Sequence, residues 1–380
     1  VYKRQGTFST PSGPGPFATI IIAPGSGASD RDGTLPMLGG NIVCLYPQLL
    51  GDTLRYYKGL GQALVDSGYA VLRYDKLEFS YPTSLGAITF KKLWLPVKSA
   101  IDYVKTRSDV DKDRIVLLGH SEGSTLIPFI ARDRDDIKAL ISVGGARTPL
   151  DSILAFQLVD FAQRCNGNIP LARSQANAIL GYFDLIRKNN WNASTPDLFG
   201  VPASTWYDYV QATDPVAENY NENQLPTLFV GMELDINVPP TELLRFEQEV
   251  NVTEDFWLIP DLNHYMATNS DPDVSVVLTD TIIYWLKEQM VSTGTKDQLI
   301  NTESISIYPN PSFGIATINS QELIQSISIY TLDGRMVRQE VYVNGNVKSQ
   351  ELNMRDLTNG VYLVRVMSTE GVSILKLVKE

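Results

Sequence analysis

The feature that most constrains the fold of this chain is the alternation of short apolar runs with longer helical segments. Apolar runs rich in β-branched residues lie at 18–23, 69–75, 114–119 and 137–145. Segments of helical character separate them at 56–68 and 93–107. Such alternation is typical of a parallel sheet whose strands are joined by right-handed crossovers. The sequence therefore predicts the α/β class, with a doubly wound and mostly parallel sheet.

The alternation is interrupted over residues 147–224. This stretch holds helical sequence such as SILAFQLVDFAQR and aromatic sequence such as STWYDYV. We interpret it as a helical cap inserted into the sheet domain. Strand patterns resume at 225–235 and 255–264, and a helix at 276–290 follows. The predicted first domain therefore spans residues 6–290, with the cap at 147–224.

The chain changes character after residue 290. Residues 291–303 are polar and lack clear periodicity, so we interpret them as a linker. From Ser304 onward, apolar and polar residues alternate with period two between turn residues. This pattern is typical of antiparallel strands. The sequence therefore predicts a separate all-β domain at 304–380, built as a small sandwich.

A potential nucleophile follows the apolar run at 114–119. Ser121 stands between Gly119 and Gly123 in the pattern G-x-S-x-G. The pentapeptide alone arises by chance in roughly one chain in ten of this length, so its context decides. A buried strand precedes it and a helix start follows it, as in a nucleophile elbow. We predict that Ser121 is a nucleophile.

A nucleophilic serine needs a base and an acid that orients the base. The chain has two histidines. We expect His120 to point away from Ser121 and to pack as a structural residue, whereas His264 lies in a loop after a strand and is the predicted base. The predicted acid is Asp235, just past an apolar strand, in preference to Glu233 at the strand end. The three residues occur along the chain in the order Ser121, Asp235, His264.

Two backbone amides are expected to form an oxyanion hole. One is the N–H of Glu122, which follows the nucleophile, and the other is the N–H of Ser26 in the sequence PGSG. A simple tight turn is the alternative interpretation of PGSG. We expect the Glu122 side chain to support the site and not to act as an acid catalyst. Aromatic residues of the insertion either line the pocket or pack the cap on the sheet: Tyr182, Trp191, Trp206 and Tyr207.

Composition excludes several classes of function. The net charge of −11 argues against binding to nucleic acid or to an anionic membrane. The sequence contains no run of 18 or more apolar residues, so we expect no membrane span. Two His and two Cys without a cluster argue against a zinc site, and we expect no cofactor. A disulfide between Cys44 and Cys165 stays open, and we expect two buried free thiols instead.

The N-terminus is expected to be truncated. The opening VYKRQ resembles a translated adapter sequence, so Val1 to Gln5 are left out of the fold prediction. A native precursor could have carried a signal peptide upstream.

The sequences PGSGASDRDG, YAVLRYDK, GHSEGS, GMELDINVP and PDLNHYMA together resemble the α/β-hydrolase superfamily. In particular they resemble bacterial serine esterases with a GSG-x-x-DRD loop and a GHSEG elbow. The resemblance covers about residues 6–290. It implies a carboxylesterase that forms an acyl-enzyme, with Ser121, Asp235 and His264 as its catalytic triad.

This chain departs from those esterases at three motifs. It reads RYDKLEFSYPTS where they usually have RYDxRGxGxS, GHSEGS where they have GHSEGG, and PG where they have HG. A serine peptidase or acyltransferase would use the same triad and stays an alternative. A non-catalytic cell-surface binding protein is the further alternative, although a binding module has no need of a triad.

The C-terminal region resembles the type A sorting domain of the type IX secretion system of Bacteroidota. The resemblance rests on YPNPSFG, DGRMV, LTNGVYLVRV and the terminal ILKLVKE. It implies the secretion machinery as a partner, with the protein secreted or held at the outer cell surface. A general β-sandwich that binds carbohydrate is the alternative interpretation.

Overall fold

A computed structural model describes residues 5–40, 42–82, 89–251, 254–290, 305–331, 336–341, 347–368 and 371–380. The chain divides into two compact units, Val1–Met290 and Val291–Glu380. The predicted linker at 291–303 lies outside the described residues, as do the first four residues of the chain.

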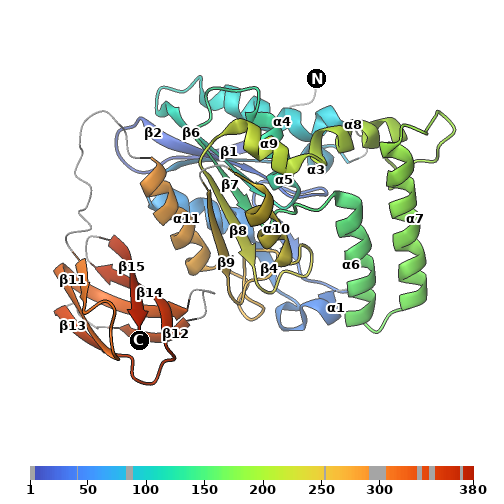
Figure 1. Cartoon of the computed structure of the whole chain (residues 1–380). Helices are drawn as coiled ribbons and strands as arrows, with labels where there is room; N and C mark the ends of the chain where they lie inside the picture. Colours follow the sequence, from blue (N-terminus) through green and yellow to red (C-terminus); the bar gives the residue numbers. More distant parts are fainter. Residues whose placement is uncertain are drawn as a thin grey trace. The chain divides into compact units, whose positions relative to one another are not determined.

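The first unit is built on a sheet that has seven strands in its described part, in the order β1-β5-β2-β6-β7-β8-β9. Strand β1 is antiparallel to β5, and every other pairing is parallel. The predicted α/β class with a mostly parallel sheet is therefore confirmed (Figure 1). The strands are β1 (Gly6–Ser9), β2 (Phe17–Ala23), β5 (Ala70–Tyr74), β6 (Val110–His120), β7 (Ala139–Val143), β8 (Thr227–Met232) and β9 (Glu254–Ile259).

The strands are apolar on both faces because helices cover both faces. In the central strand β2, Ile21 belongs to the core on one face, whereas Ile20 and Ile22 belong to the core on the other. This alternation is the two-residue period of a strand. Strand β6 begins earlier than the predicted run at 114–119, because Val110 already pairs with Phe17.

Helices on the two faces supply the rest of these cores. On one face lie α2 (Tyr56–Asp66) and α11 (Val276–Gln289). On the other lie α4 (Phe90–Val104), α5 (Glu122–Ala131) and α10 (Thr241–Glu249). Short elements fill the connections: β3 (Thr34–Pro36), α1 (Ile42–Leu45), a 3-10 turn (Pro47–Leu49), β4 (Thr53–Arg55) and α3 (Leu77–Ser80).

The excursion between β7 and β8 is helical, as the sequence predicts. Its helices are α6 (Leu150–Arg164), α7 (Ile169–Arg187), α8 (Ala203–Thr213) and α9 (Val216–Asn223). Helices α6 and α7 lie side by side at one end of the unit (Figure 1). Arg187 joins three helical segments, since its guanidinium binds the buried Asp151 at 2.5 Å and Asp214 at 2.6 Å.

A disulfide between Cys44 and Cys165 fastens this cap to the segment that follows β3. The expectation of two free thiols was therefore wrong, since the two Cα atoms lie 5.4 Å apart. Cys44 belongs to α1, and Cys165 is the residue that ends α6. The 121 residues that separate them explain why the sequence did not reveal the pair.

The second unit is all-β and antiparallel. Its long strand β11 pairs with β10 and β13 through its first half and with β12 and β14 through its second half. The pairing with β13 shifts register between Asn319 and Ile324. Aliphatic side chains such as Ile318, Ile327 and Val364 fill its core. The strands are β10 (Ile305–Tyr308), β11 (Ile315–Thr331), β12 (Met336–Val341), β13 (Val347–Asn353), β14 (Gly360–Ser368) and β15 (Gly371–Lys379).

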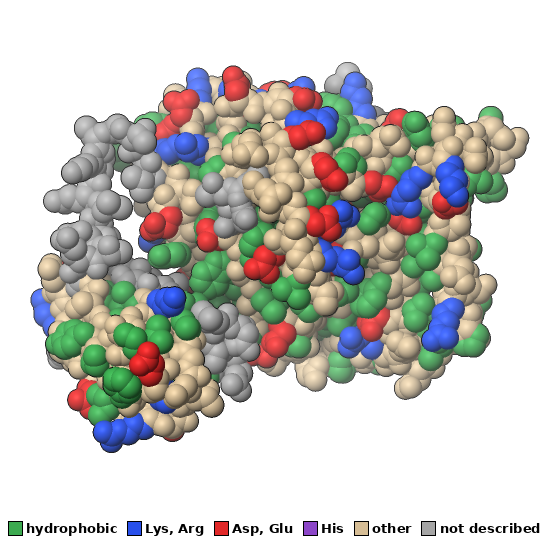
Figure 2. Space-filling view, in the orientation of Figure 1, with side chains coloured by type: hydrophobic (Ala, Val, Ile, Leu, Met, Phe, Trp, Pro, Cys, Tyr) green, Lys and Arg blue, Asp and Glu red, His purple; other side chains and the backbone are tan. Residues whose placement is uncertain are grey.

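The surface carries charges of both signs. On the face shown in Figure 2, Lys and Arg side chains are interspersed with Asp and Glu over the described residues. In that same part of the chain, no helix has both the length and the apolar character that crossing a membrane requires.

Candidate active site

Ser121 occupies a sharp turn between β6 and α5. Its backbone has φ 53° and ψ −118°, a conformation that costs a non-glycine residue about 1–3 kcal/mol. A Cβ on Gly119 would lie 2.4 Å from the Gly123 carbonyl oxygen, and a Cβ on Gly123 would lie 2.2 Å from that of Ala23. Both glycines are therefore required by close backbone approach, and the pattern G-x-S-x-G is not accidental here.

Hydrogen bonds behind the turn hold it in this conformation. The Ser121 N–H donates to the Val143 carbonyl at 2.9 Å, which ties the elbow to the end of β7. Ser124, the last residue of GHSEGS, is fully buried, and its hydroxyl donates to the Gly119 carbonyl at 2.7 Å. The departure from GHSEGG thus adds a hydrogen bond within the elbow.

Asp235 and His264 form a buried pair. Asp235 lies in the turn after β8 and His264 in the loop after β9. His264 Nδ1 donates to Asp235 Oδ2 at 2.7 Å, and Asp235 Oδ1 accepts the N–H groups of Asn237 and Val238, each at 2.8 Å. The Asp235 carboxylate is thereby fixed, and Nε2 of His264 is left as the basic nitrogen.

The pair lies beside the elbow. A Cβ on Gly144, the residue after the Val143 that binds Ser121, would lie 3.3 Å from Asp235 Oδ2 and 3.7 Å from His264 Nδ1. The ring of His264 is also 4.8 Å from the ring of His120, the neighbour of Ser121. The alternative acid, Glu233, is exposed and accepts the Asp261 N–H instead.

His120 is a buried structural residue in this geometry. Its Nε2 donates to the His264 carbonyl at 2.8 Å, so its Nδ1 accepts the Tyr57 hydroxyl at 2.9 Å. The Tyr57 oxygen in turn accepts the Gly25 N–H at 2.7 Å. Burial, reinforced by His264, lowers the pKa of His120 from 6.5 to about 3. His120 therefore stays neutral and links the His264 loop to the PGSG loop.

The PGSG loop lies against the elbow. A Cβ on Gly25 would lie 3.2 Å from the Ser121 Cβ, so the loop and the turn are in contact. Ser26 and Glu122 line one cavity together with Ser121. Within the described residues, neither the Ser26 nor the Glu122 amide donates to another group of the protein. Both amides are therefore available to an oxygen bound in the cavity.

Lys76 joins this loop to the elbow, and the sequence analysis did not identify it. It follows β5 and is 7% exposed. Its Nζ donates to the Gly25 carbonyl at 2.9 Å and to Glu122 Oε2 at 3.2 Å.

Two reciprocal ion pairs anchor the DRD sequence that follows PGSG. Arg31 binds both oxygens of the buried Asp75 carboxylate, at 2.8 Å and 2.6 Å. Arg73 donates to the Asp32 carboxylate and to the Arg31 carbonyl. Arg73 and Asp75 belong to the sequence RYD at the end of β5. Both motifs support the resemblance described above, but the sequence analysis did not infer that their charged residues pair with each other.

The cavity at Ser121 has a volume of about 80 Å³ and is bounded by the cap. Helices α6 and α8 of the cap line it with Leu150, Ile153, Leu154, Gln157, Tyr209 and Thr213. Tyr209 is thus the aromatic residue of the insertion that reaches the cavity; its hydroxyl lies beside Glu122. Burial, followed by the charge of that carboxylate, raises the pKa of Tyr209 well above its ordinary value.

The aromatic residues singled out from the sequence pack the cap and do not line the pocket. Trp206 packs on Phe183 with ring centroids 5.1 Å apart, and Trp191 packs on Tyr207 at 5.7 Å. These rings and Tyr182 pack against the core beneath the cap. None of them lines the cavity at Ser121.

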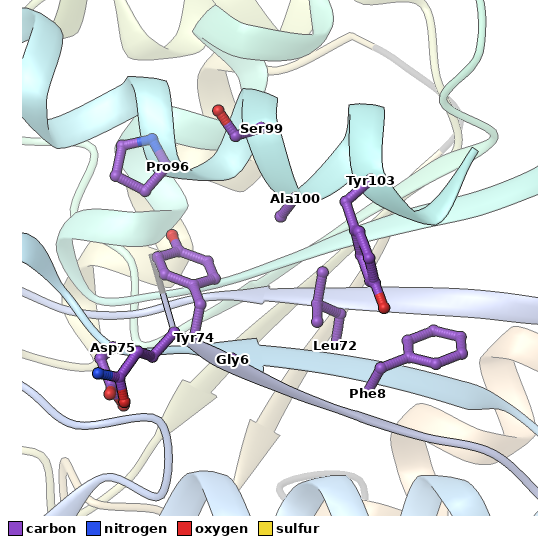
Figure 3. Close-up of a pocket in the computed structure, with 10 residues that line it drawn as sticks. Gly6, Phe8, Leu72, Tyr74, Asp75, Pro96, Ser99, Ala100 and Tyr103 are labelled. Atoms are coloured by element: carbon purple, nitrogen blue, oxygen red, sulfur yellow. The ribbon is translucent and has the colours of Figure 1, made fainter. Parts of the chain in front are cut away.

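A larger cavity, of about 290 Å³, lies apart from Ser121 between β1, β5 and α4 (Figure 3). Figure 3 shows Tyr74 and Leu72 on the strand side and Ser99 and Ala100 on the helix side. This cavity shares no lining residue with the one at Ser121, and its lining contains no histidine. Of these two cavities, the smaller one carries the candidate chemistry. The described residues also hold no cluster of His, Cys, Asp and Glu that could bind a metal ion.

Comparison with known proteins finds two family matches in the chain. Residues 42–271 match the family described as serine aminopeptidase, S33. Residues 306–380 match the secretion system C-terminal sorting domain. Esterase EstD of Thermotoga maritima is 26% identical over 276 residues, which cover 71% of this chain. The chain spans 60% of the length of EstD.

Solved structures with low sequence identity were also found. Est1E of Butyrivibrio proteoclasticus, determined with ferulic acid bound, is 18% identical with a TM-score of 0.49, covering 76% of this chain and 96% of that one. A monoacylglycerol lipase of Paleococcus ferrophilus is 15% identical with a TM-score of 0.45, covering 76% of this chain and all of that one. Since its family match spans more than half of the chain, this protein belongs to the serine aminopeptidase S33 family of α/β hydrolases, and it ends in a secretion-system sorting domain.

Proposed function

We propose that this protein is a secreted serine hydrolase that cleaves carboxylic esters through Ser121, His264 and Asp235. The observation that carries the proposal is the 2.7 Å hydrogen bond from His264 to Asp235 beside the strained elbow of Ser121. A serine at such an elbow, an imidazole oriented by a carboxylate and two open amides are the parts that acyl transfer requires.

In this mechanism Ser121 Oγ attacks the ester carbonyl while His264 Nε2 accepts its proton. Asp235 holds the imidazole in the required tautomer and stabilises the imidazolium. The Ser26 and Glu122 amides bind the oxyanion of the tetrahedral intermediate. The C–O bond to the alcohol then breaks, His264 returns the proton to the leaving alcohol, and an acyl-enzyme remains. Water, activated by His264, attacks the acyl-enzyme and releases the acid.

Ester substrates are favoured over the peptides that an aminopeptidase, the activity in the family description, would cleave. An aminopeptidase needs an anionic group for the α-amine of its substrate. Glu122 is the acidic residue in the lining of the cavity at Ser121, and its carboxylate is already paired with Lys76. The name of the relative EstD also favours an esterase. A peptidase or acyltransferase that uses the same triad is the second candidate, supported by the family description.

The volume of the cavity favours a short acyl group. One water needs roughly 10–15 Å³ of such a cavity, so about 80 Å³ holds roughly five to eight groups of that size. We therefore propose acetyl to butyryl esters as substrates. The sorting domain supports type IX export to the cell surface or beyond it, with the secretion machinery as partner.

The test is hydrolysis of p-nitrophenyl esters of increasing chain length by the full chain. We expect activity on short chains that Ser121→Ala abolishes, while Ser174→Ala, on the exposed surface of α7, leaves it unchanged. Alanine p-nitroanilide, assayed alongside, reports the aminopeptidase alternative. Activity that survives in Ser121→Ala would contradict the assigned nucleophile, and faster cleavage of the anilide would contradict the ester assignment.

A further inference from the structure

We propose that Lys76 is a positioning residue that sets the direction of the peptide group between Gly25 and Ser26, and thereby aims the Ser26 N–H at the oxyanion. This inference rests on the proposed function. Lys76 is absent from the lining of the cavity at Ser121, so it would act through the peptide and not on the substrate.

The argument begins with the peptide group itself. The Gly25 carbonyl and the Ser26 N–H belong to one planar trans unit, in which they point in opposite directions. The Lys76 ammonium binds the Gly25 carbonyl at 2.9 Å. Since that oxygen is held toward Lys76, the Ser26 N–H must point the opposite way. Ser26 lines the cavity, and its amide has no partner among the described residues.

Without such a restraint this peptide could rotate. It turns about the ψ angle of Gly25 and the φ angle of Ser26, and Gly25 has no side chain to restrict its ψ angle. The preceding peptide is held separately, because the Gly25 N–H donates to Tyr57 at 2.7 Å. Tyr57 and Lys76 therefore fix two successive peptides, and among the described residues Lys76 is the one that binds the peptide carrying the predicted oxyanion donor.

Glu122 connects the two predicted donors. Its carboxylate binds the Lys76 ammonium at 3.2 Å, and its own backbone N–H is the other donor of the oxyanion hole. The side chains of Lys76 and Glu122 are only 8% and 11% exposed, so solvent screens this contact little. The ion pair thus couples the PGSG loop to the first residue of α5.

The experiment compares the full-length wild type with Lys76→Met and with the double variant Lys76→Met/Glu122→Gln. Lys76→Met leaves a buried carboxylate without its partner, so the melting temperature should fall. The double variant removes that unpaired charge and should recover most of the loss.

In both variants the Gly25 carbonyl lacks its donor. We expect kcat on p-nitrophenyl acetate to fall about 10- to 100-fold, with KM within about threefold. Lys105→Met removes the ion pair with Asp136 and should keep kcat unchanged.

Recovery of kcat together with stability in the double variant would overturn the inference, because Lys76 would then serve stability alone. A crystal structure of Lys76→Met in which the Gly25 carbonyl keeps its direction would overturn it as well, independently of activity. A rotated peptide with reduced kcat supports it. A wild type that neither hydrolyses the esters nor reacts with a fluorophosphonate refutes the proposed function instead, and the crystal structure still decides what Lys76 does to the peptide.

Discussion

At the scale of single residues, two neighbouring histidines are held in different tautomers by their hydrogen-bond partners. His264 donates Nδ1–H to a carboxylate, whereas His120 accepts a phenol and donates to a carbonyl. A carboxylate thus binds His264, whereas among the described residues His120 is bound by a hydroxyl and a carbonyl. The proposed base and its structural neighbour are therefore distinguished by their hydrogen bonds and not by their distance from the elbow.

Replacement of the orienting carboxylate tests this distinction. Asp235→Asn keeps the shape of the side chain but can turn an N–H toward His264, which favours the wrong tautomer. We expect kcat to fall by about 10⁴-fold with little change in KM. The measurement is steady-state hydrolysis of p-nitrophenyl acetate. Glu233→Gln, at the exposed neighbouring acid, is the matched control and should retain activity; an equal loss in both variants would contradict the assignment.

His120 should make the stability of the protein depend on pH. Its pKa is about 3 in the folded chain and near 6.5 in the unfolded chain, so the unfolded chain binds more protons between these values. The free energy of unfolding should therefore fall as pH decreases from about 6.5 toward 3, by about 1.4 kcal/mol per pH unit from this group. Urea unfolding of wild type and His120→Gln from pH 4 to 8 checks this; parallel curves would contradict it.

The sequence predicts those site residues whose proposed roles follow from local context. Ser121, Asp235 and His264 each stand next to a predicted strand end, and parallel strands bring those ends to one edge. Lys76 and Tyr209 could not be found in this way. Their contacts join segments that are distant in the chain, and no local pattern encodes which segment a lysine or a tyrosine will reach.

At the scale of elements, the tight turn from β6 into α5 leaves no space for side chains at the two glycines that flank Ser121. Gly123→Ala would place a methyl group 2.2 Å from a backbone oxygen of β2. We expect this variant to lose about 1–3 kcal/mol of stability or more, together with activity. Gly181→Ala is the control, because its Cβ would meet nothing within 4 Å in helix α7.

The control substitution should stabilise the helix by about 0.5–1 kcal/mol and leave hydrolysis unchanged. Thermal unfolding and ester hydrolysis of both variants provide the comparison. A stable and active Gly123→Ala enzyme would show that the elbow can rearrange.

The disulfide gives a second prediction at this scale. It closes a long loop between α1 and the end of α6, and such a cross-link restricts the unfolded chain. Cys165→Ser should lower the free energy of unfolding by about 2–4 kcal/mol. The variant Cys44→Ser should lose the same amount, and the double variant no more than either. Denaturant unfolding measures this, and an unchanged midpoint would contradict a formed bridge.

The elements themselves were predicted more completely than their contacts. The strands of the first unit follow from short apolar runs, those of the second from a two-residue period, and the main helices from helical sequence patterns, all visible over a few residues. The pairing of Cys44 with Cys165 and the packing of Trp206 within the cap depend on tertiary arrangement, which those periods do not specify.

At the scale of the whole molecule, each unit has a hydrophobic core of its own. Among the described residues, the buried clusters of the first unit lie within 18–290 and that of the second within 305–377. We expect a chain that ends at Met290 to fold and to retain the kcat/KM of the full chain, because a domain with its own core can fold alone. Ester hydrolysis and thermal unfolding of the two forms test this. An aggregated or inactive truncated chain would show that the sorting domain is needed for folding.

The bridge between Cys44 and Cys165 also makes the folded form of the protein depend on the compartment in which it folds. Thiols are kept reduced in the cytosol and are oxidised in compartments outside it. A chain retained in the cytosol would hold its cap by packing alone, whereas an exported chain would carry it covalently fastened. The cap forms much of the cavity wall, so the redox conditions under which the chain folds decide whether a covalent bond holds that wall in place.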